Sequence, residues 1–459
     1  MSSSLSVVIL AAGFGTRMKS RITKVLHRAG GLSLIEHVVR TALTIAPAER
    51  IIAVVGHQAE RVSAALAPYG VRTALQEVPR GTGHALQCAR GAAPADGTLA
   101  VLYGDAPLLC EATLARLVMQ HTSGKAAATV LTAELDDPAA YGRIIRGSDG
   151  SVEAIIEYKA ATEAQRAIRE INSGIYCFDA ALLWRHIDGI ATGNPAGEFY
   201  LTDMVEILRA HGHRVDGQII ADFSELLGIN TKVELAEVDR LFRARKTTQL
   251  MLDGVTIERP ETVSIDVDAT IGADTIIEPN TRILGCTTIG ENARIGAGSV
   301  IGNSVIGDGV IVQPYCVIDD SWIGEAAHIG PFARLRLKNR VGAHVHIGNF
   351  VELKNTAMGD GAKANHLTYL GDSTVGSRTN IGAGTITCNY DGKKKHPTTI
   401  GAGVFVGSNS TLVAPVTLEE GSYIAAGSVI TDRVPGGALA IARGRQTNKE
   451  GWVARKKGS

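Results

Sequence analysis

The stretch "SIDVDATIGADTIIEPNTRILGCTTIGENARIGAGSVIG", residues 264–302, places an isoleucine at every sixth position. Neither the helical period of about 3.6 residues nor the two-residue alternation of a strand explains this spacing. A six-residue period is typical of hexapeptide repeats, whose apolar side chains point into a parallel β-helix. The glycine that often follows the isoleucine suits a tight corner. The sequence therefore predicts triangular coils of three hexads each.

The same register continues along the chain. Six-residue spacing, with two five-residue steps, relates the residues Ile265, Ile271, Ile277, Ile283, Ile289, Ile295, Ile301, Ile306, Val312, Ile318, Ile323, Ile329, Leu335, Val341, Ile347 and Leu353. It returns at Ile400, Val406, Leu412, Leu418, Ile424 and Ile430. We expect roughly nine coils about 4.8 Å apart, wound left-handedly against the usual crossover rule. The strict register lapses between about 358 and 400. Flat prism faces suit self-association, so we expect a homotrimer.

The first half of the chain has a different texture. Short apolar runs, "SVVILAA", "IIAVVG", "TLAVLYGD" and "AAATVLTA", alternate with helical patterns such as residues 34–39. Strand–helix–strand order predicts an α/β domain with a parallel sheet covered on both faces. We expect this domain over 1–230, a linking helix over 231–252 and the β-helix with a C-terminal tail over 253–459.

Composition narrows the function classes. Among 459 residues, Lys plus Arg equals Asp plus Glu at 46 each. This balance argues against a nucleic-acid or membrane surface as the main partner. The six cysteines form no CxxC pair and predict reduced thiols rather than a zinc site. The N-terminus has no signal-peptide pattern and no segment is apolar enough to span a membrane, so we expect a cytoplasmic protein.

A glycine-containing loop, "LAAGFGTRMKSRITKVL" (10–26), follows the first predicted strand. Gly13 and Gly15 allow close backbone approach, and loop N–H groups can bind phosphate oxygens. Arg17 and Lys24 can neutralise a triphosphate. The loop is not a dinucleotide fingerprint, because Met18 occupies the third glycine position.

These motifs carry a family resemblance. "LAAGFGTRM" with "KVL" resembles the signature of sugar-phosphate nucleotidyltransferases, and "LQEVPRGTGHA" (75–85), "LYGDAP" (102–107), "YGRI", "INSGIY" and "EFYLTD" extend the match. With the hexapeptide domain and "HLTYLGD", nearly the whole chain resembles the bacterial bifunctional N-acetylglucosamine-1-phosphate uridylyltransferases and glucosamine-1-phosphate N-acetyltransferases. The resemblance implies a Rossmann-like nucleotidyltransferase domain and a left-handed β-helix acetyltransferase domain. It also implies UTP and acetyl-CoA as co-substrates, Mg²⁺ as cofactor, and both sugar phosphates as substrates.

The first site can be read from the residues. Asp105 follows an apolar run, at the strand end where ligands bind in open α/β sheets, and a carboxylate suits Mg²⁺. A helix N-cap before Pro107 is the alternative role for Asp105. By the resemblance, Asp105 and Asn230 hold the metal, and Arg17 and Lys24 are catalytic. The resemblance implies a nucleotide- and sugar-binding set of Leu10, Ala11, Ala12, Gly13, Lys24, Gln76, Gly81, Thr82, Tyr103, Gly104, Asp105, Gly142, Glu157, Asn172, Thr202 and Asn230.

The reaction expected there is in-line attack of a sugar-1-phosphate oxygen on the α-phosphorus of UTP. Because the nucleophile is already an anion, positioning and charge neutralisation suffice. Within the resemblance, Gln76, Gly81 and Thr82 read uracil. Thr23 stands where the family usually has proline before the lysine, and Leu337 and Asn365 also depart from the family pattern.

A second set of polar residues gathers around the expected register lapse. A sugar phosphate calls for fixed cations, and a substrate ammonium needs a base, for which an imidazole such as His366 is suited. By the resemblance, His366 is that base. The implied glucosamine-1-phosphate contacts are Arg336, Lys354, Tyr369, Asn380, Tyr390 and Lys395, and the implied acetyl-CoA contacts are Ala383, Asn389, Tyr390, Ser408, Ala426 and Arg443. The alternative is that these are solvated coil surfaces.

A flat prism face makes a poor pocket. We therefore expect "TCNYDGKKKHP" (387–397) to project from the coil, and each acetyl-transfer site to use residues from more than one chain. The C-terminal "IARGRQTNKEGW" (441–452) is expected to pack nearby, with Arg443 meeting a cofactor phosphate. Two rival readings remain open: a nucleotidyltransferase whose β-helix serves only for assembly or regulation, and a non-enzymatic scaffold that merely binds nucleotide.

Overall fold

The computed structural model describes residues 5–194 and 196–457. The chain forms two compact units, 1–242 and 243–459, and the division falls inside the helix α8 (Lys232–Leu252). The first half of α8 packs Val238 into the first unit, and the second half packs Leu250 into the second. No described helix is long and apolar enough to cross a membrane.

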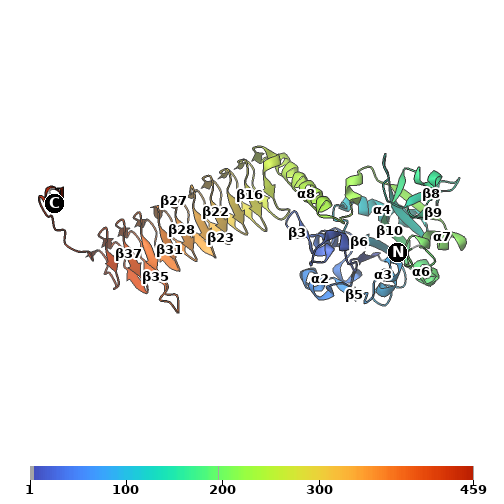
Figure 1. The fold of residues 1–459 in the computed structure, drawn as a ribbon, viewed down its shortest axis with the longest axis horizontal. Coiled ribbons are helices and arrows are strands. Elements are labelled where there is room, and N and C mark those ends of the chain that lie inside the picture. Colours follow the sequence, from blue (N-terminus) through green and yellow to red (C-terminus); the bar gives the residue numbers. More distant parts are fainter. Residues whose placement is uncertain (1–4, 195, 458–459) are drawn as a thin grey trace. The chain divides into compact units, whose positions relative to one another are not determined.

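The first unit is built on a mixed sheet (Figure 1). The order along the sheet is β11 (Val215–Ile219), β7 (Ala128–Glu134), β10 (Glu170–Asp179), β6 (Thr98–Tyr103), β1 (Leu5–Leu10), β4 (Ile51–Val55) and β5 (Arg72–Leu75), with β8 (Arg143–Arg146) and β9 (Val152–Ile156) at the side of β10. The four predicted apolar runs form β1, β4, β6 and β7. The sheet is not wholly parallel as expected, because β10 runs antiparallel to both β6 and β7.

Helices cover the sheet and bury it on two sides. They are α1 (Leu34–Leu43), α2 (Ala59–Leu66), α3 (Thr82–Ala89), α4 (Glu111–Gly124), α6 (Ala180–His186) and α7 (Asp203–Ala210), whereas the short α5 (Glu163–Arg166) buries no residue. Alternate residues of β1 enter opposite cores: Val8 packs with α3, whereas Val7 and Ile9 pack with α1. Because both faces are buried, the strands read as continuous apolar runs rather than as alternating patterns.

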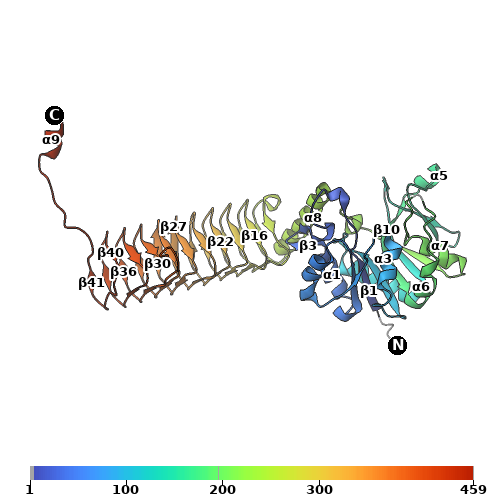
Figure 2. The same cartoon turned by 60° about the horizontal axis from the view of Figure 1, so that its bottom comes forward.

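The second unit is the predicted left-handed parallel β-helix, with three flat faces (Figure 2). Face 1 contains β12 (Thr256–Ile257), β15 (Ile276–Ile277), β18 (Arg294–Ile295), β21 (Ile311–Val312), β24 (His328–Ile329), β27 (His346–Asn349), β30 (Lys363–His366), β33 (Asn380–Ile381), β36 (Phe405–Val406), β39 (Tyr423–Ile424) and β41 (Leu439–Ala440). Face 2 contains β13 (Ser264–Ile265), β16 (Arg282–Leu284), β19 (Val300–Gly302), β22 (Val317–Asp319), β25 (Arg334–Arg336), β28 (Glu352–Lys354), β31 (Tyr369–Gly371), β34 (Ile386–Cys388), β37 (Thr411–Val413) and β40 (Val429–Ile430). Face 3 contains β14 (Thr270–Ile271), β17 (Thr288–Ile289), β20 (Val305–Ile306), β23 (Ser321–Ile323), β26 (Asn339–Val341), β29 (Ala357–Met358), β32 (Ser373–Val375), β35 (Thr398–Ile400) and β38 (Val416–Leu418).

The six-residue series forms the core of this unit, as predicted. Ile283, Ile301, Ile318, Leu335 and Leu353 are each 0% exposed and lie above one another in consecutive strands of face 2. Each coil thus buries its apolar residues against the same residues of the coils above and below. The core is a continuous aliphatic column, in which each coil contacts only its neighbours.

The expected loss of register from about 358 is wrong over most of that range. Ala364, Leu370, Val375, Ile381 and Thr387 keep the inward positions and are no more than 2% exposed. Small or polar inward residues such as Ala364 and Thr387 hide the repeat in the sequence. The true interruption is one insertion, because Ile400 follows Thr387 by thirteen positions instead of five or six. The insertion leaves the coil beside β35 (Figure 1) and is closed by an antiparallel bridge between Tyr390 and Lys395.

Replacing one inward residue tests this register. Ile318→Ala removes a fully buried side chain, and we expect it to lower the free energy of unfolding by about 2–5 kcal/mol. Val317→Ala is the matched control, because Val317 is the preceding residue and is 45% exposed. Urea unfolding followed by circular dichroism measures both. Equal midpoint shifts for the two variants would contradict the assigned register.

Candidate active sites

The glycine loop after β1 brings its cations toward the end of the sheet. Gly15 has a φ of 63°, and a Cβ there would lie 2.6 Å from Lys24 Cβ. Glycine is therefore required for the loop to fold back against Lys24. The loop continues into two short 3₁₀ helices, Thr16–Met18 and Lys24–Leu26, which carry Arg17 and Lys24.

Four predicted residues from distant parts of the sequence meet at this end of the sheet. The Lys24 ammonium forms an ion pair with Asp105 and also donates to Asn230 Oδ1 over 3.2 Å. Arg17 Nη2 donates to the same Asn230 oxygen over 2.8 Å. Two cations, one carboxylate and one amide oxygen thus converge within hydrogen-bonding reach, as a site for a metal–phosphate ligand requires.

Thr23, the departure from the family's proline, has its own structural role. Its backbone N–H donates to Gln58 Oε1 over 3.3 Å, a bond that proline could not form. Gln58 Nε2 donates in turn to the carbonyl of Arg21 over 2.6 Å. Gln58 therefore ties the loop from both sides, which replaces the rigidity that proline would give.

Two adjoining hollows lie beside these cations. The first, of about 390 Å³, is lined by the predicted residues Leu10, Ala11, Ala12, Gly13, Lys24, Gln76, Gly81, Thr82, Tyr103 and Asp105. The second, of about 530 Å³, is lined by the predicted residues Arg17, Tyr103, Asp105, Gly142, Glu157, Asn172 and Asn230. Tyr103 and Asp105 belong to both, so the two hollows meet at Asp105. Gly104 lies behind them: its N–H donates to Leu10, and a Cβ there would meet Ala11 at 3.1 Å.

A third hollow, of about 310 Å³, adjoins the second through Glu157. It contains the predicted Thr202 and two residues that the sequence analysis missed, Tyr200 and Asp203. Burial and the charge of Asp203 raise the pKa of Glu157, and burial also raises the pKa of Asp203. The motif "EFYLTD" contained both missed residues, but nothing in its spacing distinguished them from a helix start.

In the second unit, His366 lies at the corner between faces 1 and 2. It ends β30, directly opposite Asn349 of β27, and its Nδ1 donates to Asn349 Oδ1 over 3.0 Å. An amide oxygen can only accept, so this bond favours the tautomer of the neutral ring that has its proton on Nδ1 and its lone pair on Nε2. Asn349 was missed because it is one residue of a strand seventeen positions away.

Four of the six predicted acetyl-CoA contacts, Ala383, Ser408, Ala426 and Arg443, follow His366 along the same corner. The N–H of Gly384 donates to His366, the N–H of Asn409 to Ala383, and the N–H of Gly427 to Ser408. Arg443 then donates to the carbonyl of Ala426 over 2.8 Å. These hydrogen bonds define a ladder of His366, Ala383, Ser408, Ala426 and Arg443, which spans four coil steps, or about 19 Å.

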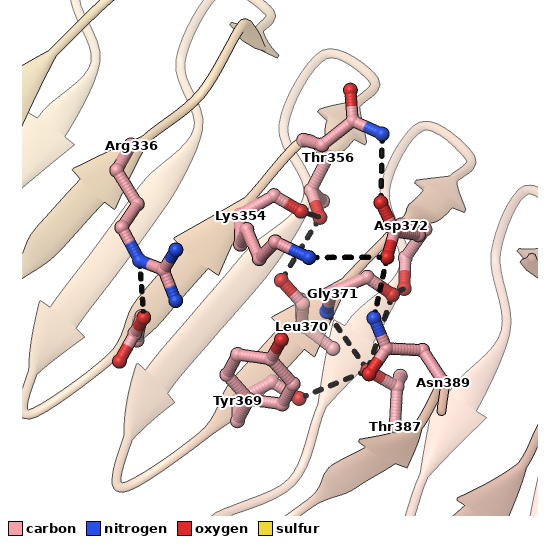
Figure 3. Close-up of polar contacts among 12 residues, drawn as sticks. Arg336, Lys354, Thr356, Tyr369, Leu370, Gly371, Asp372, Thr387 and Asn389 are labelled. Carbon is pink, nitrogen blue, oxygen red and sulfur yellow. Dashed lines mark hydrogen bonds and ion pairs between the residues drawn. The ribbon is translucent and has the colours of Figure 1, made fainter. Parts of the chain in front are cut away.

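Three cationic side chains lie at the other edge of face 2. Arg336 is the last residue of β25, Lys354 is the last residue of β28, and Lys395 belongs to the insertion that precedes β35. The neighbouring ammonium of Lys354 lowers the pKa of Lys395, and Arg336 adds to this effect. Cations this close together repel one another unless an anion binds between them. Arg336 is held by Glu352, with Nε donating over 2.7 Å (Figure 3).

Asp372 organises this edge, and the sequence analysis did not single it out. Lys354 and Asn389 both point toward its carboxylate (Figure 3), at 3.4 Å and 2.5 Å, and Asn355 donates to it over 2.8 Å. Burial would raise the pKa of Asp372, but the hydrogen bonds from Asn355 and Asn389 and the charge of Lys354 lower it. A fixed carboxylate therefore aims the lysine and the amide.

The insertion is itself ordered by a carboxylate. Asp391 accepts from the N–H groups of Lys393 and Lys394 over 2.7 Å each and from His396 Nε2 over 2.7 Å. These bonds hold the pKa of Asp391 well below its usual range. The exposed Tyr390 hydroxyl donates to the carbonyl of Gly392. The projecting hairpin is thus a defined shape, beside Asn389 and Lys395.

One chain does not bring the whole predicted set together. Tyr369 points outward from face 2, whereas Asn380 points outward from face 1. His366 stands at the corner between them, and Lys354 lies at the far edge of face 2. Residues 441–457 are exposed, and the tail meets the coil through hydrogen bonds of Ala442 and Arg443, at its start.

The two residues predicted to hold a metal ion, Asp105 and Asn230, both lie in the first unit. Among the described residues, no group of three or more His, Cys, Asp or Glu side chains could hold a metal ion. Asp105 and Asn230 supply two oxygen donors on either side of one ammonium. Two such donors fit Mg²⁺, which commonly takes one or two protein ligands and completes its shell with phosphates and water.

Known proteins resemble both units. Residues 7–174 match the MobA-like NTP transferase domain, and residues 268–303 and 397–432 match the bacterial transferase hexapeptide family. A "Bifunctional protein GlmU" of Solibacter usitatus (strain Ellin6076) is 55% identical over 100% of this chain and 98% of its own length. Those of Koribacter versatilis (strain Ellin345) and Streptomyces avermitilis are each 48% identical over 98% of this chain, and over 97% and 94% of their own lengths.

A solved structure also aligns with part of the chain. It is a putative glucose-1-phosphate thymidylyltransferase from Bacillus anthracis in complex with sucrose, with 21% identity and a TM-score of 0.41. It covers 52% of this chain and 95% of its own. A likeness at this level adds nothing to the assignment.

Proposed function

The chain belongs to the family of bifunctional GlmU proteins, and from this we propose how its two sites divide the work. The chain is an N-acetyltransferase and a uridylyltransferase: it acetylates glucosamine-1-phosphate and then joins the product to UMP from UTP. The alternative of a purely structural β-helix is disfavoured, because full-length relatives carry the bifunctional name. The observation that carries the division is that each unit has its own cluster of cations.

Uridylyl transfer is proposed at the convergence of Arg17, Lys24, Asp105 and Asn230. An oxygen of N-acetylglucosamine-1-phosphate forms a bond to the α-phosphorus of UTP, and the bond from that phosphorus to the pyrophosphate breaks. Arg17 and Lys24 neutralise the charge that develops on the departing pyrophosphate. The hollow that contains Gln76 suits the base, and the hollow that contains Glu157 and Asn172 suits the sugar.

Asp105 and Asn230 would hold Mg²⁺, which when bound neutralises triphosphate charge. In the structure, the Lys24 ammonium forms an ion pair with Asp105, so the charge of the Asp105 carboxylate is balanced by a cation. When nucleotide and metal bind, Lys24 is free to turn to a phosphate oxygen. This exchange needs no general base, because the attacking phosphate is anionic.

Acetyl transfer is proposed along face 2. Arg336, Lys354 and Lys395 bind the sugar phosphate at one edge, and Tyr369 contacts the ring on the face itself. His366 Nε2 takes a proton from the substrate ammonium at the other edge. The freed amine forms a bond to the thioester carbonyl carbon, the C–S bond breaks, and the second proton of the amine passes to the departing sulfur, so that CoA leaves as the thiol. The row of Ala383, Ser408, Ala426 and Arg443 gives an extended acetyl-CoA a line of contacts that ends at His366.

A homotrimer is proposed from the corner between faces 1 and 2. At this corner, the coils on either side carry glycine or asparagine, namely Asn280, Gly298, Gly384 and Asn409. Four consecutive coils between them carry a bulky apolar residue instead. We call these four residues, Tyr315, Phe332, Phe350 and Leu367, the corner ladder. All four have positive φ, from 48° to 62°, which costs an L-residue about 1–2 kcal/mol. They are 49–66% exposed, and the aromatic rings stack at 5.4 Å and 5.5 Å.

Strained and exposed apolar residues in a row support an interface. A cyclic axis along the corner ladder sets each rung against the same rung of its copies. Three prisms around this axis leave a wedge-shaped cleft between face 2 of one copy and face 1 of the next. Tyr369 of one copy then faces Asn380 of its neighbour, and the exposed tail has a second chain to contact. A cytoplasmic location is also proposed, since all six cysteines are free thiols.

His366→Ala tests the base. We expect acetyl transfer to fall by roughly 10²–10⁴, or about 3–5 kcal/mol of barrier, while uridylyl transfer stays unchanged. Thiol release from acetyl-CoA and pyrophosphate release from UTP measure the two reactions in the same preparation. An equal loss of both activities would refute two separate sites.

Asp105→Ala tests the other site. Metal-dependent synthesis of UDP-N-acetylglucosamine should be lost, because one oxygen donor and the partner of Lys24 are removed together. Acetylation of glucosamine-1-phosphate should be kept. Titration with Mg²⁺ is the measurement, and an unchanged metal dependence would be incompatible with the assignment of Asp105.

The corner ladder is tested by the double variant Phe332→Ser with Phe350→Ser. We expect the trimer to dissociate on light-scattering chromatography, with loss of acetyl transfer and retention of uridylyl transfer. Trp322→Ser is the matched control, since Trp322 is 47% exposed on face 3, opposite the ladder. A trimer that survives the double variant with full acetyl transfer would show that the copies meet elsewhere.

A further inference from the structure

Gln76 is a buried amide in the wall of the hollow beside the glycine loop. It follows β5, its backbone N–H donates to Val55 over 2.8 Å, and the residue is only 3% exposed. Its Nε2 donates to the carbonyl of Gly81 over 3.3 Å and lies 2.9 Å from Nδ1 of His84. Both hydrogens of this nitrogen are therefore used inside the protein.

These two bonds fix which atom the amide presents to a ligand. A backbone carbonyl only accepts, so the group facing Gly81 must be the nitrogen rather than the oxygen of Gln76. Within the described part of the chain, no group donates a hydrogen bond to Gln76 Oε1. The oxygen is left as an acceptor for whatever occupies the hollow.

His84 holds this arrangement from outside the hollow. It lies on α3 and does not line the hollow itself. To accept from Gln76, Nδ1 must be unprotonated, which puts the proton on Nε2, 4.0 Å from Cys88 Sγ. Burial and the charge of Arg80 lower the pKa of His84, so the ring stays neutral near pH 7. Burial raises the pKa of the Cys88 thiol, which stays uncharged beside it.

We propose that His84 is a positioning residue that sets nucleobase specificity, by locking the Gln76 amide with its oxygen toward the base. A base with an N–H at position 3, as in uracil or thymine, donates to that oxygen. Cytosine has a lone pair at the same position, which would face the oxygen lone pairs instead. The proposal rests on the proposed uridylyl transfer at this site and adds the reason for choosing UTP over CTP.

The test compares two nucleotides on the full-length enzyme. kcat/KM for UTP and for CTP is measured with N-acetylglucosamine-1-phosphate and Mg²⁺ in the wild type, His84→Ala, His84→Asn and Gln87→Ala. His84→Ala frees the amide to turn over, so we expect the UTP-to-CTP ratio to fall roughly 10–100-fold. His84→Asn places an acceptor oxygen near the position of Nδ1 and should restore most of the ratio.

Gln87→Ala is the matched control on α3. Gln87 donates to the carbonyl of Ile187 over 3.3 Å, away from Gln76, so its loss should leave the ratio unchanged. The midpoint of urea unfolding followed by circular dichroism, measured in every variant, reports an intact fold. His84→Ala that slows UTP and CTP equally, or Gln87→Ala that lowers the ratio as much, would overturn the proposal. A wild type without uridylyl transfer would instead refute the function on which the proposal rests.

Discussion

The stacking of one inward aliphatic residue on the next, coil after coil, is the constraint on which the second unit depends. With Ile301, Ile318, Leu335 and Leu353 in one buried column, every other residue of a coil has its height and its face assigned. Positions seventeen or eighteen residues apart then become neighbours, as Asn349 and His366 show. Outward-facing positions of a coil can therefore carry functional residues without any change to the buried core. The regular repeat thus places His366 in line with the residues proposed to contact acetyl-CoA.

The two proposed sites would bind phosphate in different ways. In the first unit, backbone glycines bring Lys24 against Asp105 and Asn230, so the cation is balanced before a ligand arrives. In the second, Lys354 and Lys395 are held near each other, and the carboxylate of Asp372 partly offsets their charge. The first arrangement suits a site that exchanges metal and nucleotide. The second suits a site that must capture a small phosphate from water on an exposed face.

Much of the fold followed from the sequence, because a repeat with a buried position at every sixth residue leaves few alternatives. The register between 358 and 387 was missed, since Ala364 and Thr387 are inward residues that do not look apolar enough. The glycine loop, Lys24 and Asp105 were identifiable from residue type and motif. Asn349, Asp372 and His84 were not, because each acts on another side chain through a contact between distant positions. The exposed tail after Ala440 and the separation of Asn380 from Tyr369 fit the proposed trimer, in which contacts between copies cannot be read from one sequence.

The central claim is that one chain holds two reaction centres that act in order. The direct measurement supplies glucosamine-1-phosphate, acetyl-CoA and UTP together and follows thiol and pyrophosphate release in one reaction. We predict thiol release whether or not UTP is present, and pyrophosphate release that follows it and requires acetyl-CoA. Pyrophosphate released at full rate without acetyl-CoA, or no thiol released with it, would contradict the account.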